Sequence, residues 1–318
     1  MRSIRIATVG TPNDYQSSLL PIIAQSLGYL IDWTSPHKAD LVVYGPFINP
    51  NPKQFRWAPR ALRPGIAFTQ DYLRRTLGQR KIMPLSLFQS AENTRHDFCG
   101  ADYAISFDLN IPTTTHFRLP YWMEMLDWSH EGITGNLNPR YGPLMSISRL
   151  SKPLGNLFLR KKQECVLLSS HFREPRKTLF DAVQKVMPVT GVGAYFNQSI
   201  RTHHTSGFLK HTLLQDFAFN LCPENGMYPG YYTEKIPEAF FADCLPITWV
   251  DGNVSVDFNP EAFINLAPMA HCDFAPFAEL IESPQKLSHY ASQPLLLRSP
   301  SILPFRDFVK RVFDDAIS

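Results

Sequence analysis

Short apolar runs that alternate with helical patterns are the feature that most constrains the fold of this chain. These runs lack the polar alternation of a half-exposed strand, so each indicates a strand buried on both faces of a parallel sheet covered by helices. An amphipathic helix is predicted at residues 17–27. In the first half of the chain the predicted strands are Ile4–Val9, Asp40–Tyr44, Ile66–Thr69, Met83–Phe88 and Tyr103–Phe107.

A second series of the same kind begins after residue 160. Between residues 128 and 158 the pattern weakens into Gly, Asn, Pro and Ser, which is typical of a linker or a loop region. We expect two α/β halves facing each other across a cleft, with domains at 1–158 and 159–300 and a helix within 301–318 that packs back on the first domain. The predicted elements of the second half are strands at 164–169, 217–221 and 245–249 and helices at 176–185, 233–242 and 305–315.

Composition agrees with two globular domains and excludes several classes of protein. At 318 residues the chain exceeds the usual size of one domain, and its 23 Phe, 12 Tyr and 5 Trp supply apolar material for two cores. A net charge of +3 is too small to indicate a nucleic-acid partner. No apolar run of about 18 residues and no hydrophobic leader is present. Five cysteines, an odd number without a CxxC pair, suit reduced thiols. We therefore expect a cytoplasmic protein, with at most peripheral contact with the inner membrane.

The densest polar stretch runs from a predicted strand into a predicted helix, FAFNLCPENGMYPGYYTEKIPEAFFADC. Its loop holds Glu224 and Asn225, and Thr233 is predicted as the N-cap of the helix. A helix N-terminus presents free N–H groups that suit a diphosphate, and Lys235 adds a full charge there. A capped helix with a solvent-facing ion pair accounts for the same local pattern equally well.

Two further positions are candidates for the same site. Arg173 and Arg176, in SSHFREPR, fall near the start of a helix, where an anionic ligand would offset the unfavourable interaction with the helix dipole. Glu92 follows a strand of the first half and could take a proton from an attacking hydroxyl. Taken alone, each is better explained as a solvated loop residue. The pair Gly191 and Gly193 lacks the rest of a dinucleotide fingerprint, and no metal-site spacing is present.

Three separate segments resemble one family of enzymes. PENGMYPGYYTEKIPEAFFADCLPITW resembles the donor-binding signature of the α1,3/4-fucosyltransferases, glycosyltransferase family 10, whose pattern is Phe-Glu-Asn-Ser, then Tyr-X-Thr-Glu-Lys, a helix and a Pro-(Ile/Val) strand. SSHFREPRKTLFDAVQKVMPVTGVG and SAENTRHDFCGADYAISFD are similar to the bacterial branch, and RLPYWMEML agrees. The resemblance spans roughly residues 85–266 in family order. The chain departs from the pattern at Pro223 for Phe, Gly226 for Ser and Tyr232 for Val.

The resemblance implies a GT-B fold, with two Rossmann-like domains facing across a cleft. It implies inverting transfer of fucose from GDP-fucose to an oligosaccharide or glycolipid, with α1,3 linkage to a GlcNAc-containing acceptor of N-acetyllactosamine type, as in Lewis-antigen lipopolysaccharide. Glu92 matches the general base. No cofactor is required, and stimulation by Mn²⁺ or Mg²⁺ is left open. The donor-binding residues implied are Arg176, Asn225, Tyr231, Glu234 and Lys235, with Arg173, Glu224 and Thr233 as further candidates.

Other functions fit the same fold. A fucosyltransferase with another linkage, or with an O-antigen or capsule acceptor, would keep the same donor residues. A non-catalytic protein that binds nucleotide-sugars or glycans would need the cations, but it has no need of a base at Glu92.

Overall fold

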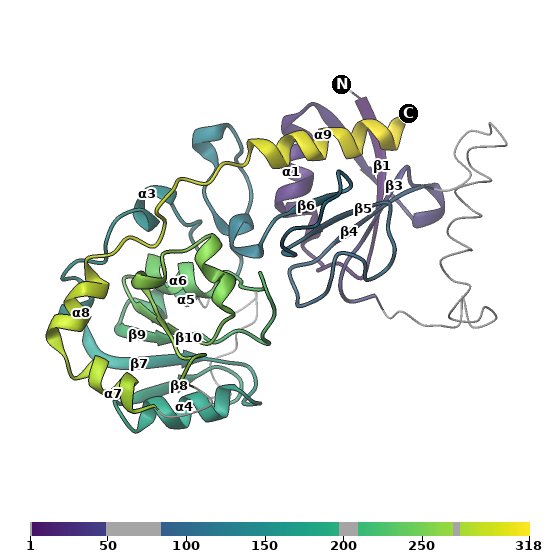
Figure 1. Cartoon of the computed structure of the whole chain (residues 1–318). Coiled ribbons are helices and arrows are strands. Elements are labelled where there is room, and N and C mark those ends of the chain that lie inside the picture. Colours follow the sequence, from purple (N-terminus) through teal and green to yellow (C-terminus); the bar gives the residue numbers. More distant parts are fainter. Residues whose placement is uncertain (1, 49–83, 197–208, 270–273) are drawn as a thin grey trace.

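The computed structural model describes residues 2–48, 84–196, 209–269 and 274–318. They form two lobes, each built on a parallel sheet (Figure 1). In the described part of the N-terminal lobe the sheet has six strands in the order β2-β1-β3-β4-β5-β6. The strand predicted at Ile66–Thr69 lies outside the described residues. The strands of this lobe are β1 (Arg2–Val9), β2 (Tyr29–Trp33), β3 (Leu41–Tyr44), β4 (Leu85–Gln89), β5 (Tyr103–Ser106) and β6 (His116–Arg118).

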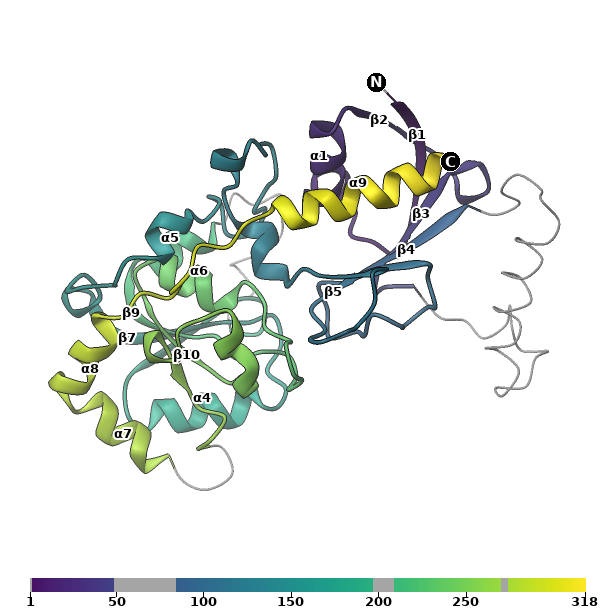
Figure 2. The same cartoon turned by 45° about the horizontal axis from the view of Figure 1, so that its top comes forward.

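The C-terminal lobe carries a five-stranded sheet in the order β11-β10-β9-β7-β8. Helices α5 and α6 cover one face of it and α4 the other (Figures 1 and 2). Every residue of β9 and β10 is buried, which explains why their sequences are largely apolar. The elements are β7 (Lys162–Leu168), α4 (Arg176–Gln184), β8 (Val189–Val192), α5 (Lys210–Leu214), β9 (Phe217–Leu221), α6 (Lys235–Phe241), β10 (Leu245–Thr248), β11 (Ile264–Asn265), α7 (Ala275–Ile281) and α8 (Pro284–Ala291).

The last helix, α9 (Leu303–Ile317), returns to the N-terminal lobe. It packs against α1 (Leu19–Ser26) and β1, so that the two ends of the chain lie close together (Figure 2). The hydroxyl of Tyr29 donates to Asp314 Oδ1 over 2.5 Å. The apolar face of α9 is buried and recurs with helical spacing. It consists of Phe305, Phe308, Val309, Val312, Phe313 and Ala316.

The connection between the lobes is more than the linker that its composition suggests. Met145 N–H donates to Met125 O over 2.9 Å, and Tyr141 is fully buried with its hydroxyl donating to Glu238 O over 2.7 Å. The segment includes α3 (Ile147–Leu150). The chain returning from α8 runs beside it, since Leu295 and Leu296 both donate their N–H groups to Leu150 O over 3.0 Å. The segment rich in small polar residues is therefore a packed connection and not an open linker.

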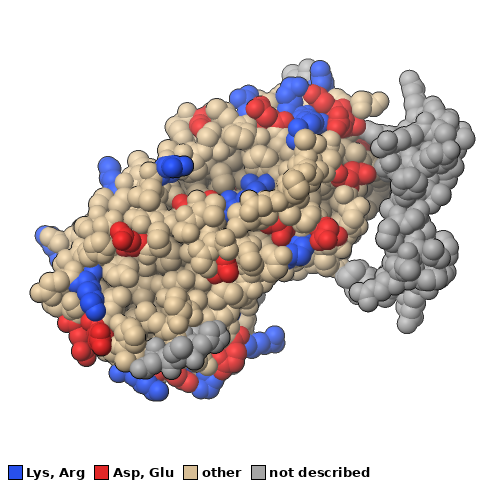
Figure 3. All heavy atoms as spheres, viewed as in Figure 1, with Lys and Arg blue, Asp and Glu red and all other residues tan. Residues whose placement is uncertain are grey.

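Surface and thiols fit the expectations from composition. On the face drawn in Figure 3, basic and acidic side chains are intermingled over both lobes. Among the described residues, no helix is long and apolar enough to cross a bilayer. The cysteines of this part of the chain are free thiols, and three of them (Cys165, Cys222 and Cys244) are buried. The cytoplasmic location stays a prediction.

Candidate functional site

Loops at the carboxyl ends of both sheets meet between the lobes. Gly226, in the loop after β9, lies so near the loop after β4 that a Cβ on it would be 2.8 Å from Asn93 Nδ2. Gly230 has a φ of +83°, and a Cβ there would be 2.8 Å from Phe107 O, just after β5. Gly230 therefore requires the absence of a side chain, whereas at Gly226 a Cβ would displace the end of the Asn93 side chain. The carboxyl end of a parallel sheet is where α/β proteins bind ligands. We call this region the interlobe site.

Three cationic side chains of the C-terminal lobe gather around His171. Arg176, only 8% exposed at the start of α4, contacts the His171 ring through Nη1, and its Nη2 donates to Asn225 Oδ1. Burial lowers the pKa of His171, and the positive charges of Arg176, Arg173 and Lys235 lower it further. The imidazole is therefore neutral near pH 7. Burial also lowers the pKa of Arg176. An anion placed among these cations would relieve their mutual repulsion.

Glu224 holds the beginning of α6 in place. Its carboxylate is fully buried, and Oε1 accepts hydrogen bonds from the N–H and the hydroxyl of Thr233 over 2.8 and 2.9 Å. Its Oε2 accepts from Lys235 Nζ over 2.8 Å. Lys235 Nζ also donates to Pro223 O over 3.0 Å and to Asn225 Oδ1 over 3.3 Å. Glu224 therefore positions Lys235, and its side chain is closed off from solvent.

The prediction that Thr233 caps α6 is wrong. The helix begins at Lys235, Glu234 occupies the N-cap position, and no side chain caps the helix there. The Thr233 hydroxyl is instead used as a donor to Glu224, nine residues earlier in the chain. With only seven residues, α6 has a short dipole, so the positive character of this site comes mainly from its side chains.

Glu92 approaches this group from the N-terminal lobe. It is half-buried in the loop after β4, where its N–H donates to Ser90 Oγ over 3.1 Å. Burial raises the pKa of Glu92, and so does the negative charge of Glu234, while Lys235 and Arg140 act in the opposite direction. The structure thus brings Glu92 into electrostatic contact with the start of α6. A carboxylate with a raised pKa is a stronger base, provided that it is deprotonated.

Tyr231 lies between the lobes rather than on an open surface. It is 2% exposed, and its ring meets that of Phe107 at 5.0 Å between centroids in an edge-on arrangement. Burial raises the pKa of Tyr231, as do the charges of Glu224 and Glu92, so its hydroxyl remains a donor. Glu234 is partly exposed beside it. Tyr231 and Glu234 are the two remaining residues that the resemblance assigns to donor binding.

Several side chains at the site were not singled out from the sequence. Besides His171, the guanidinium of Arg95 lies 3.3 Å from the ring centroid of Tyr228 in the other lobe, a cation–π contact. Arg140 is exposed and acts electrostatically on Glu92 and on Tyr121. Their partners are distant in the chain, and no local motif marks such pairs.

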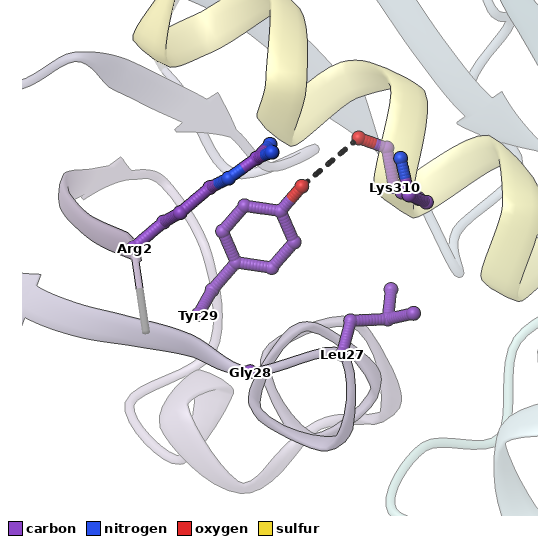
Figure 4. A pocket seen from close by; sticks show the side chains of 5 residues that line it. All are labelled: Arg2, Leu27, Gly28, Tyr29 and Lys310. Carbon is purple, nitrogen blue, oxygen red and sulfur yellow. Dashed lines mark hydrogen bonds between the residues drawn. The ribbon is translucent and has the colours of Figure 1, made fainter.

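A separate cavity of about 310 Å³ lies under α9, away from the interlobe site. It is lined by Arg2, Leu27, Gly28, Tyr29 and Lys310 (Figure 4). Both of its cations pair with Asp314, so it offers an anion little charge. Within the described ranges no group of three or more His, Cys, Asp or Glu could hold a metal ion. Metal independence stays a prediction.

Comparison with known proteins identifies relatives of both halves of the chain. Residues 158–292 match the model of glycosyltransferase family 10 (fucosyltransferase), C-terminal domain. The α-(1,3)-fucosyltransferase FucT of Helicobacter pylori is 30% identical over 216 residues, which are 62% of this chain and 42% of that protein. The chain therefore spans less than half the length of this relative.

Solved structures of α1,3-fucosyltransferase are similar over nearly the whole chain. The structure with GDP-fucose has a TM-score of 0.64 at 21% identity and covers 99% of this chain and 91% of that one. A second structure has a TM-score of 0.65 at 23% identity, covering 98% and 90%. The likeness confirms the predicted GT-B fold of two Rossmann-like domains.

Proposed function

We propose, from the match of residues 158–292 to the model of glycosyltransferase family 10, that the protein transfers fucose from GDP-fucose to a glycan with inversion at the anomeric carbon. The proposed acceptor contains GlcNAc, as in N-acetyllactosamine, and the proposed linkage is α1,3. One observation carries this proposal: the cations around His171 in one lobe lie opposite Glu92, a half-buried carboxylate of the other lobe.

The cations account for departure of the leaving group. In an oxocarbenium-like transition state, negative charge grows on the diphosphate as the bond from fucose C1 to the phosphate oxygen breaks. Arg173, Arg176 and Lys235 are proposed to hold that charge, in a geometry fixed in advance by Asn225 and the buried Glu224. Because Glu224 is fully buried and bonded to Lys235 and Thr233, we assign it and Thr233 to positioning. Direct contacts of Asn225, Tyr231 and Glu234 with the donor remain proposals.

Glu92 accounts for activation of the acceptor. As the acceptor oxygen forms its bond to C1, its proton passes to Glu92, and GDP leaves from the opposite side. A single displacement of this kind inverts the anomeric carbon and needs one base without a covalent nucleophile. The raised pKa of Glu92 suits the role because it makes the carboxylate a stronger base. The rate should rise as pH increases through that pKa, since only the deprotonated form can accept the proton.

The test compares GDP release from GDP-fucose with N-acetyllactosamine, with lactose and with no acceptor. We expect release that depends on one acceptor. Glu92→Gln keeps the shape of the side chain but removes its charge, so release falls about 10²–10⁴-fold, while GDP affinity measured by calorimetry is unchanged. Near-normal turnover in this variant would exclude Glu92 as the base.

Lys235→Ala separates binding from proton transfer. It removes a phosphate partner and leaves the buried Glu224 uncompensated, so GDP affinity falls about tenfold or more. Lys162→Ala, at a lysine that is 60% exposed beside Glu164, is the matched control and keeps wild-type affinity. If the wild type binds GDP-fucose but releases no GDP with a broad set of glycans, the non-catalytic alternative replaces our proposal.

A further inference from the structure

A partly buried ion pair joins the two lobes beside the interlobe site. Arg118 ends β6 in the N-terminal lobe, and Asp257 lies beyond β10 in the other lobe. Arg118 donates from Nη1 and Nη2 to the two carboxylate oxygens over 3.2 and 2.7 Å, an arrangement with strict geometry. Trp122 Nε1 donates to the same carboxylate over 3.3 Å. The side chains of Arg118 and Asp257 are 23% and 14% exposed, so solvent screens the pair only partly.

Tyr232 connects this pair to the helix that carries Lys235. Its hydroxyl accepts from Arg118 Nη2 over 2.7 Å and donates to Asn253 O over 3.4 Å. The residue is 1% exposed, and it immediately precedes Thr233, whose N–H is held by Glu224.

The other contacts described between these loops constrain the lobes less. The Phe107–Tyr231 and Arg95–Tyr228 contacts are made by rings, whose attraction tolerates sliding. The forked pair of Arg118 and Asp257 tolerates little displacement of one lobe against the other, because both of its hydrogen bonds depend on angle.

We propose that Arg118, Asp257 and Tyr232 form a clamp that fixes the start of α6 against the N-terminal lobe. The clamp sets the separation between Glu92 and a donor held by Lys235, so that Tyr232 and Arg118 are positioning residues. This consequence rests on the proposed function, since an acceptor oxygen on one lobe must come within reach of C1 on the other. Errors of about 1 Å in such a separation cost up to about a hundredfold in rate.

Tyr232→Phe tests the clamp with the loss of one oxygen. The ring would keep its place against Phe258, 5.7 Å away between centroids. We expect kcat to fall about tenfold, with GDP affinity and the KM for GDP-fucose unchanged, because the donor contacts lie within the C-terminal lobe. The control is Tyr29→Phe, which loses a hydroxyl bonded to Asp314 far from the site and keeps wild-type kcat. Wild-type kcat in Tyr232→Phe, or an equal loss in both variants, would overturn the positioning role.

A second measurement does not depend on activity. Amide hydrogen exchange is followed in residues 116–122 and 231–236, in the wild type, Tyr232→Phe and Arg118→Lys. Lysine keeps the charge of Arg118 but not its fork, so we expect both variants to exchange faster than the wild type in both segments, with Arg118→Lys the faster. If the wild type releases no GDP with any acceptor, the proposed function fails and exchange alone decides on the clamp. Unchanged exchange in both variants would overturn it.

Discussion

Glu124 is a partly buried carboxyl group that has no cationic partner within the described residues. Gln89 Nε2 donates to its Oε1 over 2.9 Å, and Tyr15 in turn donates to Gln89 Oε1 over 2.6 Å. Burial raises the pKa of Glu124 to about 7 from an ordinary value of 4.5. The folded protein therefore keeps a proton that the unfolded chain loses at lower pH. This stabilising contribution is complete below about pH 4.5 and is lost as pH rises through about 7.

Glu124→Gln should remove that dependence on pH. At pH 8 we expect the free energy of unfolding of the variant to exceed that of the wild type by about 2 kcal/mol, after allowance for partial exposure. At pH 4 the two should agree, because a protonated carboxyl and an amide offer Gln89 the same acceptor. Urea unfolding at both pH values measures the difference. Glu279→Gln, at a carboxylate whose side chain is 74% exposed, is the control with wild-type stability throughout. An equal difference at both pH values would contradict the titration of Glu124.

The sequence predicts the charged residues of the site better than the residues that hold them in position. Glu92, Arg176 and Lys235 follow predicted strands or open predicted helices, so topology alone places them at the facing edges of the sheets. The local pattern predicts Thr233 as a cap because it does not include Glu224. This residue lies in the preceding loop and accepts the N–H of Thr233. The partnership of Arg118 with Asp257 depends on how the lobes meet, and no spacing in the sequence encodes that.

Among the described elements, the strands that were predicted are the interior ones, while the strand predicted at Ile66–Thr69 stays a prediction. The four strands that the apolar runs do not reveal are β2, β6, β8 and β11, and each lies at an edge of its sheet. An edge strand is covered on fewer sides, so it needs no continuous apolar run. Strand β2, for example, alternates between buried and exposed positions, and β6 has no fully buried residue. The number of strands is therefore harder to derive from sequence than the class of fold.

Helix α9 supplies a prediction at the same scale. Phe313 is fully buried, and its ring contacts that of Tyr29 at 5.1 Å between centroids. Phe313→Ala should lower the free energy of unfolding by about 3–5 kcal/mol, because the cavity left behind cannot collapse completely. Ile317→Ala, at a position that is 36% exposed on the same helix, should change it by less than about 1 kcal/mol. Denaturant unfolding measures both. Similar losses in the two variants would mean that α9 is not anchored through its apolar face.

Across the whole molecule, the return of α9 means that the chain joins the lobes twice. Arg298 lies in an exposed part of the second connection, between α8 and α9. If a protease site inserted after Arg298 is cut, α9 should stay bound through its buried face and co-elute in size-exclusion chromatography. GDP affinity should be retained, whereas transfer should fall about tenfold as the lobes lose one of their connections. The inserted but uncut protein is the control. Release of α9, or full activity after cutting, would contradict the expectation.

The two connections also touch along their length. Ile302 N–H donates to Glu131, Leu295 and Leu296 to Leu150 O, and Gly155 to Ala291 O. Contact at several points along two connections restricts sliding and twisting of the lobes more than a single linker would. In the proposed reaction a nucleotide-sugar enters between the lobes and must then be aligned with an acceptor, so one rotation about these connections would serve both steps. Opening and alignment then become the same movement run in opposite senses.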